Sequence, residues 1–302
     1  MYITPVQQLQ SRHGSGNFPK QATLYFSSTL DKTYFGQQPP PVNKHPLMQR
    51  ILGGKPVVLY HGQHDTTNAH ELLEEAIKRK TSFEIDGNIV TVKGPDGKKR
   101  EYFVNAHHPK SYLLGFGKFP GNGDPANLHP KRYLDRARET GLFIKFDFKS
   151  PKAIKAFGEL AQNMPAEQRM VHVCYAPLDY RRLKLAPHKN AELFSPCDLQ
   201  QLRQYIGENT PLLLSCKGLR QKDLTDELLA DIALKTKGQA QFVNFNPKGG
   251  KNIPAQFARK AWQEYGIISE IKIKDEFDKL YWDAAQIPYL GVTDQVDLAT
   301  VW

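Results

Sequence analysis

Acidic and basic side chains occur in this sequence at spacings that suit one reaction centre. Glu84 and Asp86 lie two positions apart at the end of an apolar run, and Asp147 and Lys149 repeat that spacing further along the chain. In a β-strand, residues i and i+2 point to the same face, so each pair can act on one ligand. Carboxylate oxygens are the ligands that Mg²⁺ and Ca²⁺ prefer. We therefore predict a Mg²⁺ or Ca²⁺ site formed by Glu84, Asp86 and Asp147.

Histidines stand beside these acidic pairs in the sequence. His61 follows the apolar run before Glu84, and His107 and His108 come after Asp86. An imidazole with a pKa near 6.5 can give or take a proton at neutral pH. We predict that His61 and His108 act as general acid and base on a phosphodiester, with His107 as the alternative to His108. Lys149 would stabilise the negative charge that develops on the phosphate.

Eight short apolar runs must position these groups, and helical patterns lie between most of them. The runs cover residues 57–60, 82–86, 142–147, 170–174, 212–215, 241–244, 267–273 and 289–293. Eight strand–helix units within residues 53–302 match a (β/α)₈ TIM barrel, which typically has about 250 residues. A doubly wound open α/β sheet would show the same alternation. In a barrel, the active site lies at the carboxyl ends of the strands, where the predicted residues of the first three strands would meet.

Two segments interrupt the strand–helix alternation. Residues 89–93 and 101–105 flank the turn Pro95-Asp96-Gly97, which predicts a β-hairpin after the second strand. This hairpin would return His107 and His108 to the barrel mouth, and the Gly-rich stretch that comes next would form a lid. Residues 1–52 are rich in Gln, Ser and Pro without sustained periodicity, so we expect an irregular N-terminal arm.

The bulk composition limits the partners and the compartment. The net charge is +10, from 41 basic and 31 acidic residues, which favours anionic partners such as phosphate esters or an acidic membrane surface. No motif interleaves basic and aromatic residues on one sheet face, so nucleic acid is not expected. The three cysteines show no framework spacing, which fits a reducing compartment. Without an apolar membrane span or a secretory signal, we expect a cytoplasmic protein, or one exported without such a signal.

Several of these motifs together resemble the phospholipase-C-like phosphodiesterase superfamily, which includes glycerophosphodiester phosphodiesterases, sphingomyelinase D-type toxins and menorin-like proteins. Phe83-Glu84-Ile85-Asp86 resembles the Glu-x-Asp metal pair of that superfamily, and Ala106-His107-His108-Pro109 resembles its second catalytic histidine, in the menorin-like form. Residues 144–149 resemble its Glu-x-Lys and Lys-x-Asp-Phe-Lys strands. Residues 291–298 resemble its closing Gly-x-x-Thr-Asp-x-x-Asp strand. The resemblance spans residues 57–300.

The residues and the resemblance together predict a metal-dependent phosphodiesterase that acts on a glycerophosphodiester or a phospholipid headgroup. The attacking group would be water or a hydroxyl of the substrate itself. A protein from a different class remains the alternative, namely a catalytically silent barrel that binds a phospholipid headgroup or a protein partner. Turnover of phosphodiesters with metal, compared with chelator, distinguishes the two.

Overall fold

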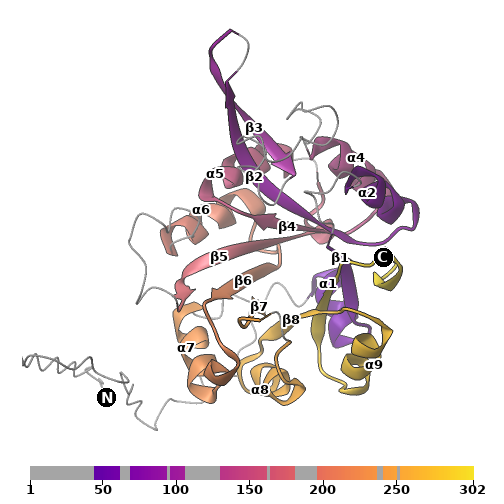
Figure 1. Ribbon diagram of the computed structural model, residues 1–302, viewed down its shortest axis with the longest axis vertical. Coiled ribbons are helices and arrows are strands. Elements are labelled where there is room, and N and C mark those ends of the chain that lie inside the picture. The colour runs from indigo at the N-terminus through magenta and orange to yellow at the C-terminus, as the bar shows by residue number, and fades with distance from the viewer. Residues whose placement is uncertain are drawn as a thin grey trace, which may run out of the picture. The chain divides into compact units, whose positions relative to one another are not determined.

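The computed structural model describes residues 44–61, 69–93, 96–105, 130–161, 164–180, 196–236, 241–249 and 252–302. Eight parallel strands pair in the ring order β1-β9-β8-β7-β6-β5-β4-β2 (Figure 1). Tyr60 of β1 pairs with Phe83 of β2 and closes the ring. The (β/α)₈ barrel is therefore confirmed, and the open doubly wound sheet is excluded.

The barrel strands fall where the apolar runs predict them. They are β1 (Val57–Tyr60), β2 (Phe83–Lys93), β4 (Ile144–Phe148), β5 (Arg169–Asp179), β6 (Leu212–Lys217), β7 (Phe242–Asn244), β8 (Ile268–Lys272) and β9 (Tyr289–Thr293). The helices are α1 (Pro46–Leu52), α2 (Ala69–Lys78), α4 (Lys131–Thr140), α5 (Pro151–Ala161), α6 (Pro196–Ile206), α7 (Asp226–Thr236), α8 (Ala255–Tyr265) and α9 (Glu276–Ala284). Short 3₁₀ turns cover Ala166–Gln168, Gln221–Asp223 and Val296–Leu298.

The barrel interior changes from apolar to polar along the strand direction. An apolar layer fills the amino-terminal end, formed by Val57, Leu59, Phe143, Met170, Leu213, Phe242, Ile268 and Leu290. Two residues further along, the side chains with the same inward direction are mostly polar. These are His61, Lys145, His172, Ser215, Asn244 and Glu270, with Val292 as the apolar member. The lower layer stabilises the ring by hydrophobic burial, which leaves the upper layer available for chemistry.

Helix α1 packs against the apolar layer and belongs to the same hydrophobic cluster. Leu47, Met48 and Ile51 are each at most 3% exposed. His45 caps the helix, because its Nδ1 accepts a hydrogen bond of 3.1 Å from the amide of Leu47. The N-terminal arm predicted as irregular through residue 52 is therefore helical over Pro46–Leu52.

The predicted hairpin is confirmed by the long strand β2 and its antiparallel partner β3 (Lys99–Asn105). The pairing runs from Gly87 opposite Asn105 to Lys93 opposite Lys99. Val90 and Val104 are buried at its base, whereas the residues next to the turn are exposed. Figure 1 shows that this hairpin extends away from the barrel.

The final residues of the chain lie between β1 and β2 at the amino-terminal end of the barrel. The Thr300 amide donates to the carbonyl of Val58 at 2.8 Å, and the Ser82 amide donates to the carbonyl of Thr300 at 3.4 Å. The ring of Trp302 stacks on Phe143, with 4.8 Å between the ring centroids. The strands β1 and β2 share a single registered pair, Tyr60 with Phe83, and this segment lies between them where they are not paired.

Within the described ranges, no helix has the length and apolar character needed to cross a lipid bilayer.

Candidate functional site

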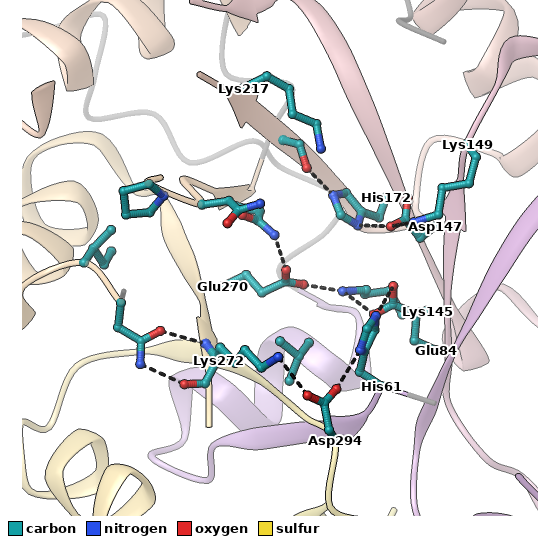
Figure 2. Close-up of a pocket in the computed structure, with 17 residues that line it drawn as sticks. His61, Glu84, Lys145, Asp147, Lys149, His172, Lys217, Glu270, Lys272 and Asp294 are labelled. Carbon is teal, nitrogen blue, oxygen red and sulfur yellow. Dashed lines mark hydrogen bonds and ion pairs between the residues drawn. The ribbon is translucent and has the colours of Figure 1, made fainter. Parts of the chain in front are cut away.

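A cavity of about 290 Å³ opens at the carboxyl ends of the barrel strands (Figure 2). It is lined by side chains from all eight parallel strands or the residues just after them. They are His61, Glu84, Lys145, Asp147, Lys149, His172, Ser215, Lys217, Asn244, Asn246, Pro247, Asn252, Ile253, Glu270, Lys272, Val292 and Asp294. Ionisable groups dominate this lining, so the cavity is suited to a charged ligand.

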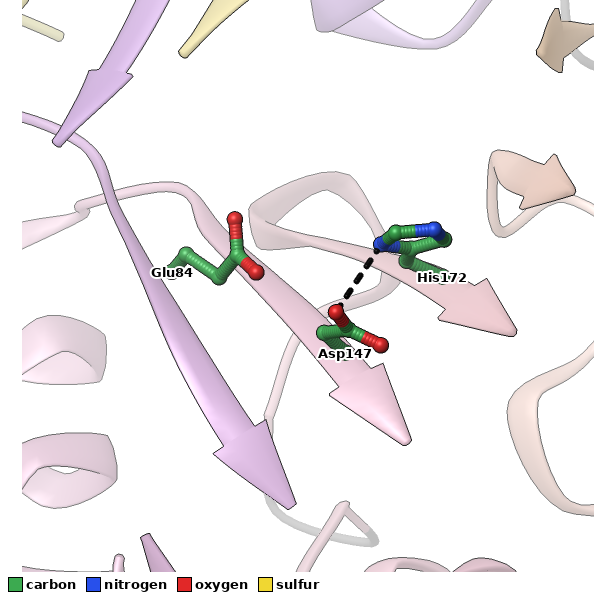
Figure 3. A group of neighbouring side chains, drawn as sticks. All are labelled: Glu84, Asp147 and His172. Carbon is green, nitrogen blue, oxygen red and sulfur yellow. Dashed lines mark ion pairs between the residues drawn. The ribbon is translucent and has the colours of Figure 1, made fainter. Parts of the chain in front are cut away.

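Three of these side chains form a group that can hold a cation. Glu84, Asp147 and His172 come from the adjacent strands β2, β4 and β5, and one potential ligand atom of each lies within 4.8 Å of the others (Figure 3). Asp147 and His172 are registered partners across β4 and β5, and Oδ2 of Asp147 is 3.3 Å from Nδ1 of His172. Sequence analysis predicted two members of this group, and the structure adds His172.

The chemistry of this group fits a divalent cation. Glu84 Oε2 and His172 Nδ1 are buried and make no hydrogen bond among the described residues, although an opposite charge lies beside each. A carboxylate oxygen has more than one lone pair, so Glu84 can coordinate a metal ion in addition to its contact with Lys145. Within the part of the chain that the structure describes, the nearly buried carboxylates of Glu84, Asp86, Asp147 and Glu270 lie around the ammonium groups of Lys145 and Lys149. These carboxylates supply the oxygen ligands that a divalent cation prefers.

Lys145 is a buried ammonium between two glutamates. Its Nζ lies 2.7 Å from Oε2 of Glu84 and also donates a hydrogen bond to Glu270. Burial alone would lower the pKa of Lys145, but Glu270 and Glu84 outweigh burial and raise the pKa above its ordinary value. Asn244 donates to the other oxygen of Glu270 at 2.6 Å, which fixes this carboxylate from a third strand.

Lys149 bridges two of the predicted metal ligands. Its Nζ is 2.5 Å from Oδ2 of Asp147 and 2.7 Å from Oδ1 of Asp86. Burial would raise the pKa of the Asp147 carboxyl, but His172 and Lys149 outweigh burial and hold that pKa well below its usual range. Asp147 is therefore ionised and able to bind a cation at neutral pH.

His61 is held in a fixed orientation at the end of β1. Its Nδ1 is 2.9 Å from Oδ1 of Asp294, and Lys272 holds the other oxygen of that carboxylate at 2.7 Å. The opposite ring nitrogen, Nε2, is directed toward Glu84 at 3.9 Å. The negative charge of Glu84 raises the pKa of His61 to about 9 against the effect of burial, and the hydrogen bond with Asp294 adds to this rise. The imidazole of His61 is thus protonated at neutral pH.

The predicted site residues fall into three sets. His61, Glu84, Asp147 and Lys149 line one cavity. Asp86 contacts Lys149 and lies outside the three-residue group, so its role as a metal ligand stays a prediction. His107 and His108, together with the predicted lid, lie outside the described residues.

Sequence analysis missed Lys145, Glu270 and Lys272, which face the same cavity. The available signal was strand alternation, because Lys145 lies two residues before Asp147, and Glu270 and Lys272 repeat that spacing on β8.

Comparisons with known proteins do not assign a family to this chain. No family model matches the chain, and no curated protein matches its sequence. A glycerophosphodiester phosphodiesterase from Agrobacterium tumefaciens is 12% identical with a TM-score of 0.40, covering 80% of this chain and 98% of its own.

A second structure from that organism, a putative glycerophosphoryl diester phosphodiesterase, is 10% identical with a TM-score of 0.47, over 80% of this chain and 95% of its own. The YdjI aldolase from Escherichia coli is 8% identical with a TM-score of 0.42, over 83% of this chain and 79% of its own. Function must therefore be argued from the site.

Proposed function

We propose that this protein is a metal-dependent phosphodiesterase that cleaves a glycerophosphodiester or a phospholipid headgroup. The observation that supports this most strongly is the convergence of Glu84, Asp147 and His172 within 4.8 Å at the barrel mouth. The protonated His61 and the ammonium of Lys149 line the same cavity. A cation site, a proton donor and an additional positive charge are groups that can each contribute to phosphodiester cleavage.

The metal would be held by Glu84, Asp147 and His172. A divalent ion bound there polarises a phosphate oxygen and offsets negative charge in the transition state. The two carboxylates favour Mg²⁺ or Ca²⁺. The imidazole of His172 is also a ligand that Mn²⁺ and Zn²⁺ accept, so these two metals should be tested as well.

His61 would act as the general acid. Its Nδ1 is engaged with Asp294, so the proton on Nε2 is the one directed into the cavity. This proton would pass to the departing alkoxide. Lys149 would contact the phosphate from the β4 side. His108, or His107, stays our prediction for the general base.

Imine chemistry at Lys145 is disfavoured. A lysine must lose its proton before its amine can attack a carbonyl. Glu84 and Glu270 hold the buried Lys145 in its charged form. The amine of Lys145 is therefore not available as a nucleophile.

The direct test is turnover of a phosphodiester panel with Mg²⁺, Ca²⁺, Mn²⁺ or Zn²⁺, each compared with chelator. We expect metal-dependent release of a phosphomonoester or a cyclic phosphate. Glu84→Gln should lower kcat/KM by at least about a hundredfold, because it removes a ligand charge. Glu101→Gln is the matched control, since Glu101 is an exposed carboxylate on β3. Equal activity with metal and with chelator would contradict the proposal.

One observation favours the silent headgroup-binding or partner-binding barrel as a second candidate. Lys145 and Lys149 already lie against Glu84 and Asp147, so these carboxylates are partly neutralised without a metal ion. Such a cavity can bind an anionic headgroup through its lysines alone. Headgroup binding without turnover of any diester, with every metal tested, would establish this alternative.

A further inference from the structure

The cavity has a second half that the proposed metal and proton-transfer groups do not use. Glu84, Asp147 and His172 come from β2, β4 and β5, whereas β6, β7 and β8 complete the far arc of the ring. In an eight-stranded ring with this order, β6 lies across from β1. Lys217 at the end of β6 therefore faces the cavity from the side opposite His61.

Most polar groups of this far arc are already engaged. Asn244 donates to Glu270, and Nδ2 of Asn252 donates to the carbonyl of Lys272 at 2.7 Å. The ammonium of Lys272 is bound to Asp294. These side chains line the cavity, but the amide and ammonium groups named here already have partners within the protein.

Lys217 differs from these groups. Its ammonium has no carboxylate partner within the described ranges, and its contact is the thiol of Cys174 on β5. Lys217 is only partly exposed, and Figure 2 shows its side chain directed toward the cavity. An ammonium without a carboxylate partner is available to bind an anionic group of a ligand.

The size and lining of the cavity define the ligand further. A volume of about 290 Å³ accommodates a small polar ester. None of the described lining residues is Phe, Tyr or Trp, so these residues cannot form the aromatic cage that binds a quaternary ammonium group such as choline. Asparagine and lysine side chains instead suit oxygen-rich, anionic groups.

We propose that Lys217 forms an anion subsite, and that the substrate is a small phosphodiester with a second anionic group, a carboxylate or a phosphate, on the ester arm directed toward β6. The phosphodiester part of this inference rests on the proposed function. The anion subsite itself rests on the position of Lys217 and on its lack of a counter-charge among the described residues.

A matched pair of substrates tests the subsite. We suggest glycerol phosphodiesters of 3-hydroxypropanoate and of its amide, which differ only in the charge of the arm. The wild type should prefer the carboxylate by about tenfold in kcat/KM, mainly through KM, since a charge-assisted hydrogen bond has this strength. Lys217→Gln should abolish the preference, and Lys217→Arg should retain part of it.

The control is Lys222→Gln, which removes an exposed lysine after the same strand and should keep the full preference. If the wild type shows no preference, or if Lys217→Gln lowers kcat/KM equally for both esters, the anion subsite is wrong. The second result would mean that Lys217 contacts the phosphate that both esters share, or that it stabilises the fold.

A binding measurement separates this inference from the proposed function. If no diester is cleaved, calorimetric titration with 3-phosphonopropanoate and with its amide takes the place of kinetics. Tighter binding of the carboxylate by about tenfold, lost in Lys217→Gln, would retain the subsite while the phosphodiesterase proposal fails. Equal binding of the two compounds, or binding of neither, would overturn the subsite.

Discussion

The ammonium of Lys145 balances Glu84 and Glu270 inside the barrel, and its removal tests the charge balance of the site. Lys145→Met should destabilise the metal-free protein by about 3–5 kcal/mol, because two buried carboxylates lose their shared counter-charge. A divalent cation should restore more stability to the variant than to the wild type, since it supplies the missing charge. Urea denaturation with metal and with chelator measures both effects.

Lys155→Met provides the control for this experiment. Lys155 is exposed on α5, and its substitution should change the free energy of unfolding by less than about 0.5 kcal/mol. A metal response in Lys145→Met no larger than that of the wild type would contradict a cation site at Glu84.

His61 gives the site a defined dependence on pH. Its pKa in the folded protein is raised from 6.5 to about 9, first by Glu84 and then by Asp294. Because the folded pKa exceeds the unfolded one, this stabilisation is fully present below pH 6.5 and is lost as the pH rises through about 9. In chelator, the difference in unfolding free energy between wild type and His61→Gln should therefore shrink over that interval.

An NMR titration of the His61 imidazole provides the direct measurement. A midpoint near the ordinary histidine value in the metal-free protein would show that Glu84 and Asp294 do not hold the proton, and His61 would then not be fully charged at neutral pH.

At the scale of the elements, strand alternation explains why the site could be predicted in part. Glu84, Asp147 and His61 follow local apolar runs, and barrel topology places the ends of neighbouring strands together. Glu270 could not be assigned in this way, because its partner Lys145 is 125 residues away and on a non-adjacent strand. Which inward residues meet across a barrel depends on ring closure, and a local pattern does not contain that information.

Two helices show the same limit of local patterns. In α4, the buried Tyr133, Leu134 and Ala137 form a short apolar stripe at helical spacing, and the remaining residues are polar or charged, so the helix has only three apolar positions by which it can be recognised. Helix α1 has only seven residues and stands within a segment predicted as irregular. Its helical form depends on packing against the barrel, which outweighs weak local preference.

Helix α1 therefore permits a matched pair of substitutions. Ile51 is 2% exposed, and its neighbour Leu52 is 38% exposed. Ile51→Ala should lower the free energy of unfolding by about 2–4 kcal/mol through lost burial and an unfilled cavity. Leu52→Ala should cost much less. Similar losses of unfolding free energy for the two variants in urea denaturation would show that the packing of α1 against the apolar layer does not stabilise the barrel.

At the scale of the whole molecule, the β2–β3 hairpin concentrates positive charge away from the barrel. Lys93 and Lys99 are registered partners across the two strands, and Lys98 is adjacent. Like charges directly opposite each other are unfavourable unless an anionic surface offsets them. The hairpin tip is therefore our proposed contact with an acidic membrane.

Vesicle sedimentation tests this contact. We expect binding to vesicles with phosphatidylserine that weakens with salt, because each lysine near such a surface contributes about 1 kcal/mol. Replacement of Lys93, Lys98 and Lys99 with Gln should greatly reduce binding. Replacement of three exposed lysines elsewhere, Lys55, Lys155 and Lys222, should have a smaller effect. Equal loss in the two triple variants would show that net charge alone is responsible.

The insertion of residues 300–302 between β1 and β2 links this segment to the proposed site. His61 comes after β1 and Glu84 lies on β2, so the proposed proton donor and the proposed cation ligand stand on opposite sides of this junction. Deletion of Thr300, Val301 and Trp302 would remove the hydrogen bonds to Val58 and Ser82. The two strands would then separate more often, and amide hydrogen exchange would accelerate first at this junction. Removal of three residues that do not line the cavity would thus move His61 away from Glu84. The proposed activity would fall although every side chain of the cavity is still present.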